Sequence, residues 1–181
     1  MTRTALAGAL ACALLAAFAT PALAQDANLP VPGVAPARDV PGYVEGPDKS
    51  LTFKLLFDVA TEGKPDAVHP MLEAVARFVN TLAKSGVPAD HRKIAVVFHQ
   101  GGTDYILQAD EYKKRHDGKD NPSAAMIQAL KKAGVDFRVC GQAVLGRKID
   151  PKTIMPEVQL DLWAMTTIAN FLAKGYALIG G

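Results

Sequence analysis

The feature that most constrains this chain is a short, near-continuous apolar run, KIAVVFH, at residues 93–99. A strand with one solvated face alternates apolar and polar residues, whereas a strand covered on both faces is apolar almost throughout. The run therefore predicts a strand in the interior of a parallel sheet that helices cover on both faces.

Segments with strand composition and segments with helical periodicity alternate along the rest of the chain. Strands are expected at residues 51–59, 93–99, 136–140, 157–164 and 176–180. Helices are expected at 66–87, 121–135 and 165–175, with a short one around 142–145 and a surface helix plus loop in the polar stretch 105–120. This alternation predicts right-handed crossovers. The expected fold class is α/β: three layers, a mainly parallel five-stranded sheet, and helices on both faces.

Two of the expected helices have clear apolar faces and end signals. The helix at 66–87 should stop at Gly86, and the helix at 121–135 should be capped by Asn121, with Pro122 in its first turn. The expected buried residues of the first are Val68, Leu72, Val75, Phe78, Val79 and Leu82, and those of the second are Met126, Ile127 and Leu130.

The first 24 residues have the order of a secretory signal peptide. A start containing Arg3 precedes the uncharged apolar stretch 5–19, which is short for a membrane span, and residues 21–24 end in an A-x-A pattern. We expect cleavage after Ala24 and a periplasmic mature protein without membrane contact; a retained membrane anchor is the competing interpretation. Residues 25–50 contain five prolines and predict an extended arm, which leaves 51–181 as the α/β domain.

The charge balance and the glycine pattern exclude several classes of ligand. The chain has 20 Lys and Arg against 18 Asp and Glu, and Arg3 alone of these lies in the expected signal peptide. Such a balance offers no basic surface for nucleic acid or anionic lipid. The HQGG segment at 99–102 lacks the G-x-G-x-x-G spacing and a P-loop lysine, so no nucleotide cofactor is expected.

Two groups of polar and small residues follow neighbouring strands. In parallel α/β sheets, ligands collect beyond the carboxyl ends of the strands, so the two groups should share one site. The candidate residues are His99, Gln100 and Gly101 after the second strand, Cys140, Gly141 and Gln142 after the third, and Arg147.

Cys140 is the only cysteine that remains once Cys12 leaves with the signal peptide, so the monomer has no internal disulfide. The helix that starts after Cys140 would place backbone N–H groups near its sulfur and stabilise a thiolate, and Gly141 would let a substrate approach. His99 and Arg147 would strengthen this effect. The alternative is that Cys140 is a small buried residue without chemistry.

Other polar and aromatic residues carry weaker signals. His99 and Cys140 alone are too few ligands for a closed zinc centre, so no metal is expected. The other histidines, His69, His91 and His116, fall on helix or loop segments elsewhere. We expect Asp104 and Asp110 to be solvated charges on a helix, and Trp163 and Met165 to lie in the core or in an interface.

The segments KIAVVFHQGG, NPSAAMIQALKKAGVDFRVCGQAVLGRKI and YALIGG together resemble the DsrE/DsrF-like family, in particular its secreted members. Val-Cys-Gly-Gln after an Ala-Gly-Val helix end is the most specific part. The resemblance implies a flavodoxin-like or Rossmann-like α/β subunit of the DsrE type that assembles into trimers or hexamers. It also implies a cysteine that carries sulfane sulfur as a persulfide, which by position would be Cys140, with His99 lining the same cleft. The relay members are cytoplasmic, whereas this chain has an export signal.

The leading hypothesis is a periplasmic sulfur carrier or sulfurtransferase-like protein that holds a persulfide on Cys140. Its partners would be the thiol of a donor or acceptor protein, or a small sulfur species. The alternative is a non-enzymatic oligomeric binding or scaffold subunit in which Cys140 is buried and structural. Transient binding of a soft ion such as Cu(I) by Cys140 is a third hypothesis, since thiolates favour such ions.

Overall fold

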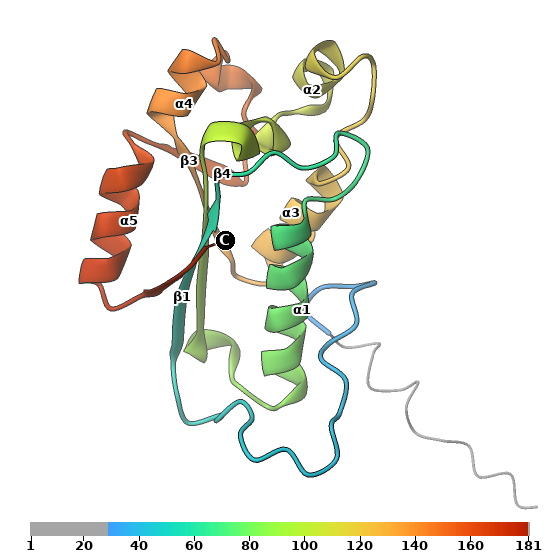
Figure 1. The fold of residues 1–181 in the computed structure, drawn as a ribbon, viewed down its shortest axis with the longest axis vertical. Helices are drawn as coiled ribbons and strands as arrows, with labels where there is room; N and C mark the ends of the chain where they lie inside the picture. The colour runs from blue at the N-terminus through green and yellow to red at the C-terminus, as the bar shows by residue number, and fades with distance from the viewer. Residues whose placement is uncertain (1–28, 181) are drawn as a thin grey trace, which may run out of the picture.

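The structure, a computed structural model, describes residues 29–180. The expected signal peptide lies outside the described residues. Five strands form one sheet in the order β4-β3-β2-β1-β5, and every neighbouring pair is parallel (Figure 1). The strands are β1 Phe53–Val59, β2 Arg92–Phe98, β3 Asp136–Cys140, β4 Val158–Asp161 and β5 Ala177–Ile179. The sheet confirms the expected α/β fold class.

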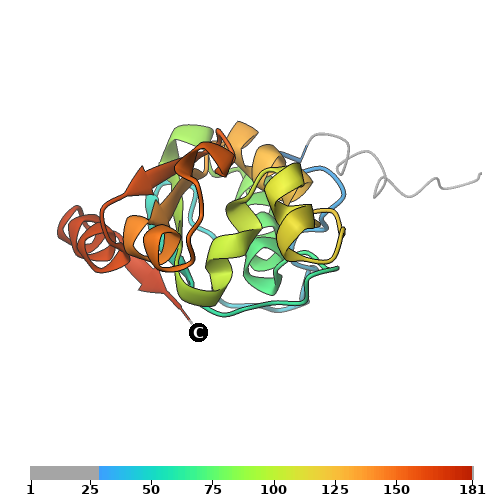
Figure 2. The same ribbon diagram turned by 90° about the horizontal axis from the view of Figure 1, so that it is seen from above.

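Helices cover the sheet on both faces. Helices α1 (Pro70–Lys84) and α3 (Ala124–Lys132) lie on one side, and α4 (Gly141–Gly146) and α5 (Ala164–Ala173) lie on the other (Figure 1). Helix α2 (Ala109–Arg115) and the 3₁₀ helix η4 (Gln100–Ile106) lie beyond the carboxyl ends of the strands, and two further 3₁₀ turns are η3 (Ala89–His91) and η5 (Pro151–Thr153). From above, α5 lies on the opposite side of the molecule from residues 29–50 (Figure 2).

The two faces of the sheet carry cores of different size. Strand β2 is buried on both faces from Ile94 to Phe98, as the apolar run predicted. The larger core lies between the sheet and helices α1 and α3. The smaller one, between the sheet and α5, consists of Leu56, Ala95, Val97, Cys140, Ala164 and Phe171. Cys140 therefore points to the α5 side of the sheet.

Helix α1 begins four residues later than the apolar spacing predicted, at Pro70. His69 is its N-cap: the Nδ1 atom accepts the backbone N–H of Met71 at 3.1 Å, and Nε2 lies 3.1 Å from the carbonyl of Thr61. Burial of the His69 ring lowers its pKa. Val68, which the pattern included in the helix, precedes it because the histidine cap fixes the start.

Helix α3 also starts later than expected, at Ala124, with Ser123 at the N-cap position. Asn121 is buried and binds loops instead of capping the helix directly. Its Nδ2 donates to the carbonyls of Tyr105 and Leu107 at 2.9 Å each, and its Oδ1 accepts the N–H of Ser123 at 3.0 Å.

Residues 29–50 contain neither helix nor strand and pack against α1. Val31 is fully buried, and the side chain of Asn80 binds the backbone on both sides of it. Asn80 Oδ1 accepts the N–H of Val31 at 2.9 Å, and Nδ2 donates to the carbonyls of Val31 and Val34 at 2.8 and 2.7 Å. The arm is therefore fastened to the domain of its own chain.

The prediction of a surface helix and loop at 105–120 is wrong for its first part. Helix α2 is present and Asp110 is exposed, but Tyr105, Ile106 and Leu107 are buried in the larger core. The prediction failed because the stretch is rich in charged residues and its three buried apolar residues are consecutive. They lie in and next to η4, so they do not have the spacing of an amphipathic helix.

Candidate functional site

Cys140 lies at the carboxyl end of β3, on the wall of a pocket of about 450 Å³. The side chains that line the pocket come from the ends of three strands and from the helices α4 and α5 that follow them. They include His99, Gln100, Cys140, Gln142, Arg147 and Trp163. Cys140 is 4% exposed, so its sulfur is nearly covered by protein but borders this pocket.

The amide of Ala164, the first residue of α5, donates a hydrogen bond to the Cys140 sulfur at 3.2 Å. The first N–H groups of a helix have no partner within the helix, and they form its partially positive end. A donor of this kind stabilises negative charge on sulfur. The sequence predicted that the amides directly after Cys140 would be the donors. The observed donor is instead the amide of Ala164, where the β4–α5 junction enters α5.

Gly141 and Gln142 hold the β4–α5 junction in place. A Cβ atom on Gly141 would lie 2.7 Å from the carbonyl oxygen of Asp161 and 3.1 Å from that of Leu162. Gln142 Nε2 donates to the carbonyl of Leu162 at 3.2 Å. Gly141 therefore allows the close packing of two backbones, and both residues position the amide of Ala164.

His99 follows β2, and its ring is bound by a carboxylate that the sequence analysis did not single out. Its Nε2 lies 2.6 Å from Oδ1 of Asp58, the penultimate residue of β1. A carboxylate only accepts hydrogen bonds, so Nε2 carries the proton and Nδ1 of the neutral ring is left as an acceptor. This is the arrangement by which a carboxylate orients a histidine base.

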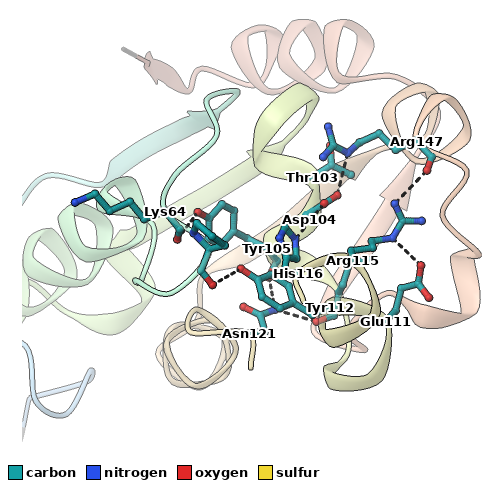
Figure 3. A network of polar contacts seen from close by, with 12 residues as sticks. Lys64, Thr103, Asp104, Tyr105, Glu111, Tyr112, Arg115, His116, Asn121 and Arg147 are labelled. Atoms are coloured by element: carbon teal, nitrogen blue, oxygen red, sulfur yellow. Dashed lines mark hydrogen bonds and ion pairs between the residues drawn. The ribbon is translucent and has the colours of Figure 1, made fainter. Parts of the chain in front are cut away.

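Arg147 reaches the pocket from the end of α4 and is held by Asp104. Its Nε donates to Asp104 Oδ1 at 2.9 Å, and its Nη1 donates to the carbonyl of Gln100 at 3.4 Å. The hydrogen bond to Asp104 raises the pKa of Arg147. Oδ2 of the same carboxylate lies 3.2 Å from Nε2 of His116, which stacks on Tyr112 (Figure 3).

The expectation that Asp104 is a solvated charge is wrong. Its side chain is 10% exposed, and it links the pocket to the buried aromatic residues around α2. Burial raises the pKa of Tyr112 to about 12, and its hydroxyl donates to the carbonyl of Pro65 at 3.0 Å (Figure 3). Asp104 is flanked by Thr103 and Tyr105 in the sequence, and the burial of its side chain follows from the position of η4 in the folded chain.

Gln100 and Gly101 have different surroundings. Gln100 lines the pocket and has a positive φ of 46°, which lets its carbonyl accept from both Arg147 and Thr103. Gly101 does not line the pocket: its N–H donates to Ala60 at 2.9 Å, and a Cβ there would lie 2.6 Å from the backbone nitrogen of Glu62.

Five of the seven candidate residues therefore meet at one pocket: Cys140, His99, Gln100, Gln142 and Arg147. Gly101 and Gly141 pack behind it. The sequence analysis missed Asp58, Asp104 and Ala164. A single carboxylate near the end of the apolar strand FKLLFDV was an available signal for Asp58, whereas Ala164 acts through its backbone and leaves none.

Trp163 and Met165 form part of the pocket wall rather than of the core. They are 48% and 61% exposed and lie with Ile168 at the start of α5. Within residues 29–180, no three His, Cys, Asp or Glu side chains come close enough together to hold a metal ion. No helix in the described part of the chain is long and apolar enough to cross a membrane.

These features define a three-layer α/β protein with a thiol pocket at the carboxyl edge of its sheet. A model of the DsrE/DsrF-like family matches residues 54–180. The chain belongs to the DsrE/DsrF-like family, which confirms the resemblance. Membership in this sulfur-relay family supports a sulfur-carrier role at the level of the family.

Comparison with curated proteins finds no match. Among solved structures, a protein of unknown function from Methanobacterium thermoautotrophicum, MTH1491, is similar to this chain. The two are 19% identical with a TM-score of 0.48, and the alignment covers 71% of this chain and 99% of that one.

Proposed function

We propose that this protein is a periplasmic sulfur carrier, with sulfurtransferase-like chemistry, that holds sulfane sulfur as a persulfide on Cys140. The observation that carries the proposal is the pocket at the Cys140 sulfur, where the Ala164 amide donates to that sulfur and the Asp58-bound His99 ring lines the same pocket. A thiol that accepts a hydrogen bond and shares its pocket with a carboxylate-bound histidine has the groups that thiol exchange requires.

The transfer balances without an external oxidant. The Cys140 thiolate attacks the outer sulfur of a donor persulfide, R–S–SH; a new S–S bond forms on Cys140, and the donor S–S bond breaks to release R–S⁻. An acceptor thiolate then attacks the outer sulfur of the Cys140 persulfide and leaves the Cys140 thiolate. In this scheme His99 removes the proton of the resting thiol, and the Ala164 amide stabilises the negative charge on Cys140.

Two further parts of the proposal concern location and assembly. The export signal expected in residues 1–24 supports a periplasmic protein. Exposed apolar side chains on α5 and β5 support a homo-oligomer, and the family resemblance suggests a trimer or hexamer. No nucleic acid, membrane, metal or cofactor is part of the proposed mechanism.

Intact-protein mass spectrometry after incubation with a polysulfide donor tests the proposal. The wild-type protein should gain the mass of one sulfur atom on Cys140, and a thiol acceptor should remove it. Cys140→Ser should gain nothing. Equal behaviour of the two proteins would contradict the persulfide role.

The low exposure of Cys140 favours a second candidate, an oligomeric binding or scaffold subunit with a structural cysteine. In that case the native protein would resist iodoacetamide until it unfolds. Rapid alkylation of the native protein, through the pocket, would exclude this candidate.

A further inference from the structure

The pocket at Cys140 limits which sulfur compounds can reach the thiol. Cys140 is 4% exposed, and its sulfur is approached from a pocket of about 450 Å³. This volume lies in the range of sites for small organic molecules. A low-molecular-weight sulfur compound can enter a pocket of this size.

The composition of the wall selects a compound with an apolar body. Trp163, Met165, Ile168 and Ala143 supply most of the wall on the α4 and α5 side. A small hydrated inorganic ion would leave these surfaces unused, but an organic stem would be desolvated against them.

Arg147 supplies a single cationic group on the same wall. Its Nε and Nη1 are bound to Asp104 and to the carbonyl of Gln100, and within residues 29–180 no group accepts a hydrogen bond from Nη2. Asp104 also contacts His116, so its carboxylate is shared between two partners. The Nη2 atom of a guanidinium held in this way is left to donate a hydrogen bond to a carboxylate or sulfonate.

We propose that this pocket binds a low-molecular-weight organic thiol or persulfide that has an apolar stem and one carboxylate or sulfonate group. The acid group lies on Arg147, the stem lies along Trp163 and Met165, and the sulfur reaches Cys140. The pocket thus selects a small organic sulfur donor or acceptor. The role of this ligand as a sulfur donor rests on the proposed function, but its binding does not.

Trp163 is the only tryptophan of the chain and lines the pocket, so its fluorescence reports on binding. The probes are 3-(benzylthio)propanoate, its neutral amide of the same shape, and thiosulfate as an inorganic anion. The wild-type protein should bind the carboxylate at least about tenfold more tightly than the amide, because the amide cannot form a charge-assisted hydrogen bond with Arg147. Thiosulfate should bind more weakly than the carboxylate.

Arg147→Met should remove most of the difference between the carboxylate and the amide. Arg77→Met, which changes an exposed arginine of α1 away from this pocket, should keep that difference. If circular dichroism shows that Arg147→Met does not fold, the comparison of the carboxylate and amide probes on the wild-type protein still tests the proposal. Equal binding of the two probes, absence of binding, or tighter binding of thiosulfate would each overturn the proposal.

Ligand binding and persulfide formation are measured separately on the wild-type protein, by Trp163 fluorescence and by mass spectrometry, which separates this inference from the proposed function. If the wild-type protein shows selective binding but no persulfide forms, the sulfur-carrier function fails alone. If a persulfide forms without selective binding, the substrate class proposed here fails alone.

Discussion

At the scale of residues, one hydrogen bond to Asp58 determines which ring nitrogen of His99 carries the proton. The Asp58 carboxylate accepts a hydrogen bond from Nε2–H at 2.6 Å, which leaves Nδ1 as the nitrogen that can take up a proton. Asp58→Asn would offer an amide that can donate as well as accept, so the ring would no longer be held in one tautomer. We expect the rate of Cys140 alkylation by iodoacetamide near neutral pH to fall by roughly tenfold or more.

The matched control for this prediction is Asp110→Asn, which removes an exposed carboxylate from α2 and should leave the alkylation rate unchanged. The rates should be measured across a pH series, since loss of a base changes the shape of the profile and general destabilisation does not. Identical profiles for Asp58→Asn and wild-type protein would show that His99 does not act on the thiol.

The sequence predicted candidate residues where the signal was local. His99 and Cys140 end predicted strands, Gln100 follows directly, and Arg147 lies seven residues after Cys140, so the βα pattern placed them at one edge of the sheet. Asp58, Asp104 and Ala164 depend on how three distant segments approach one another. Such contacts arise from tertiary packing, and the periodicity of one segment contains no information about them.

At the scale of elements, the junction between β4 and α5 is held by a close contact at Gly141. Gly141→Ala should destabilise the protein by about 1–3 kcal/mol, because the new Cβ meets two backbone carbonyls that cannot move independently. Gly146→Ala is the control, since a Cβ there has no neighbour within 4 Å. This second change should be neutral or should stabilise by about 0.5–1 kcal/mol.

Urea unfolding of both variants measures these free energies. If Gly141→Ala is as stable as Gly146→Ala, the junction is not packed as described. The Gly141→Ala variant should also show slower persulfide formation, because a displaced junction moves the Ala164 amide away from the sulfur.

The cap of α1 couples the stability of the protein to pH. His69 accepts the N–H of Met71 only when Nδ1 is unprotonated, and burial lowers the pKa of the ring in the folded protein. The unfolded chain therefore binds a proton more readily than the folded one below about pH 6.5. The contribution of His69 to stability is complete above that pH and is lost as the pH falls toward the folded-state pKa.

His69→Asn tests this coupling, because asparagine also caps helices but does not titrate. The decrease in melting temperature between about pH 7.5 and about pH 5 should be smaller in the variant than in the wild-type protein, since the His69 contribution is removed. Equal decreases in the two proteins would assign the pH dependence to other groups.

Sequence reasoning recovered the elements better than their ends. The apolar run of β2 and the stripe on α1 are properties of consecutive residues, so they predicted the sheet interior and the helix. The start of α1 depends on a histidine cap, and the buried segment from Tyr105 to Leu107 depends on contacts with Asn121. Caps and loop packing require side chains that approach from elsewhere in the chain.

At the scale of the whole molecule, the two faces of the sheet are covered unequally. Strands of parallel sheets are normally covered on both faces, yet all three residues of the edge strand β5 are exposed. Leu178, Ile179 and, on the neighbouring helix α5, Leu172 add to this apolar surface. An exposed apolar surface on an edge strand is typical of a contact between subunits.

The oligomer that we propose should therefore depend on the α5 and β5 surface. Sedimentation equilibrium of the chain from Gln25 onward should give a mass that is a multiple of the monomer, three or six if the family resemblance extends to assembly. The double variant Leu172→Glu with Leu178→Glu should sediment as a monomer, because burying two carboxylates in an apolar contact costs more than the contact contributes.

Ala74→Glu places the same charge on an exposed position of α1, on the far side of the sheet, and should leave the oligomer intact. A monomeric wild-type protein would contradict the assembly itself, and an oligomeric double variant would move the contact to another surface. The Cys140 pocket is lined by residues at the start of α5, whereas Leu172 lies near the end of α5 and Leu178 lies in β5. The monomeric variant should therefore still form the persulfide. Loss of the persulfide in that monomer would show instead that the site is complete only in the assembled protein.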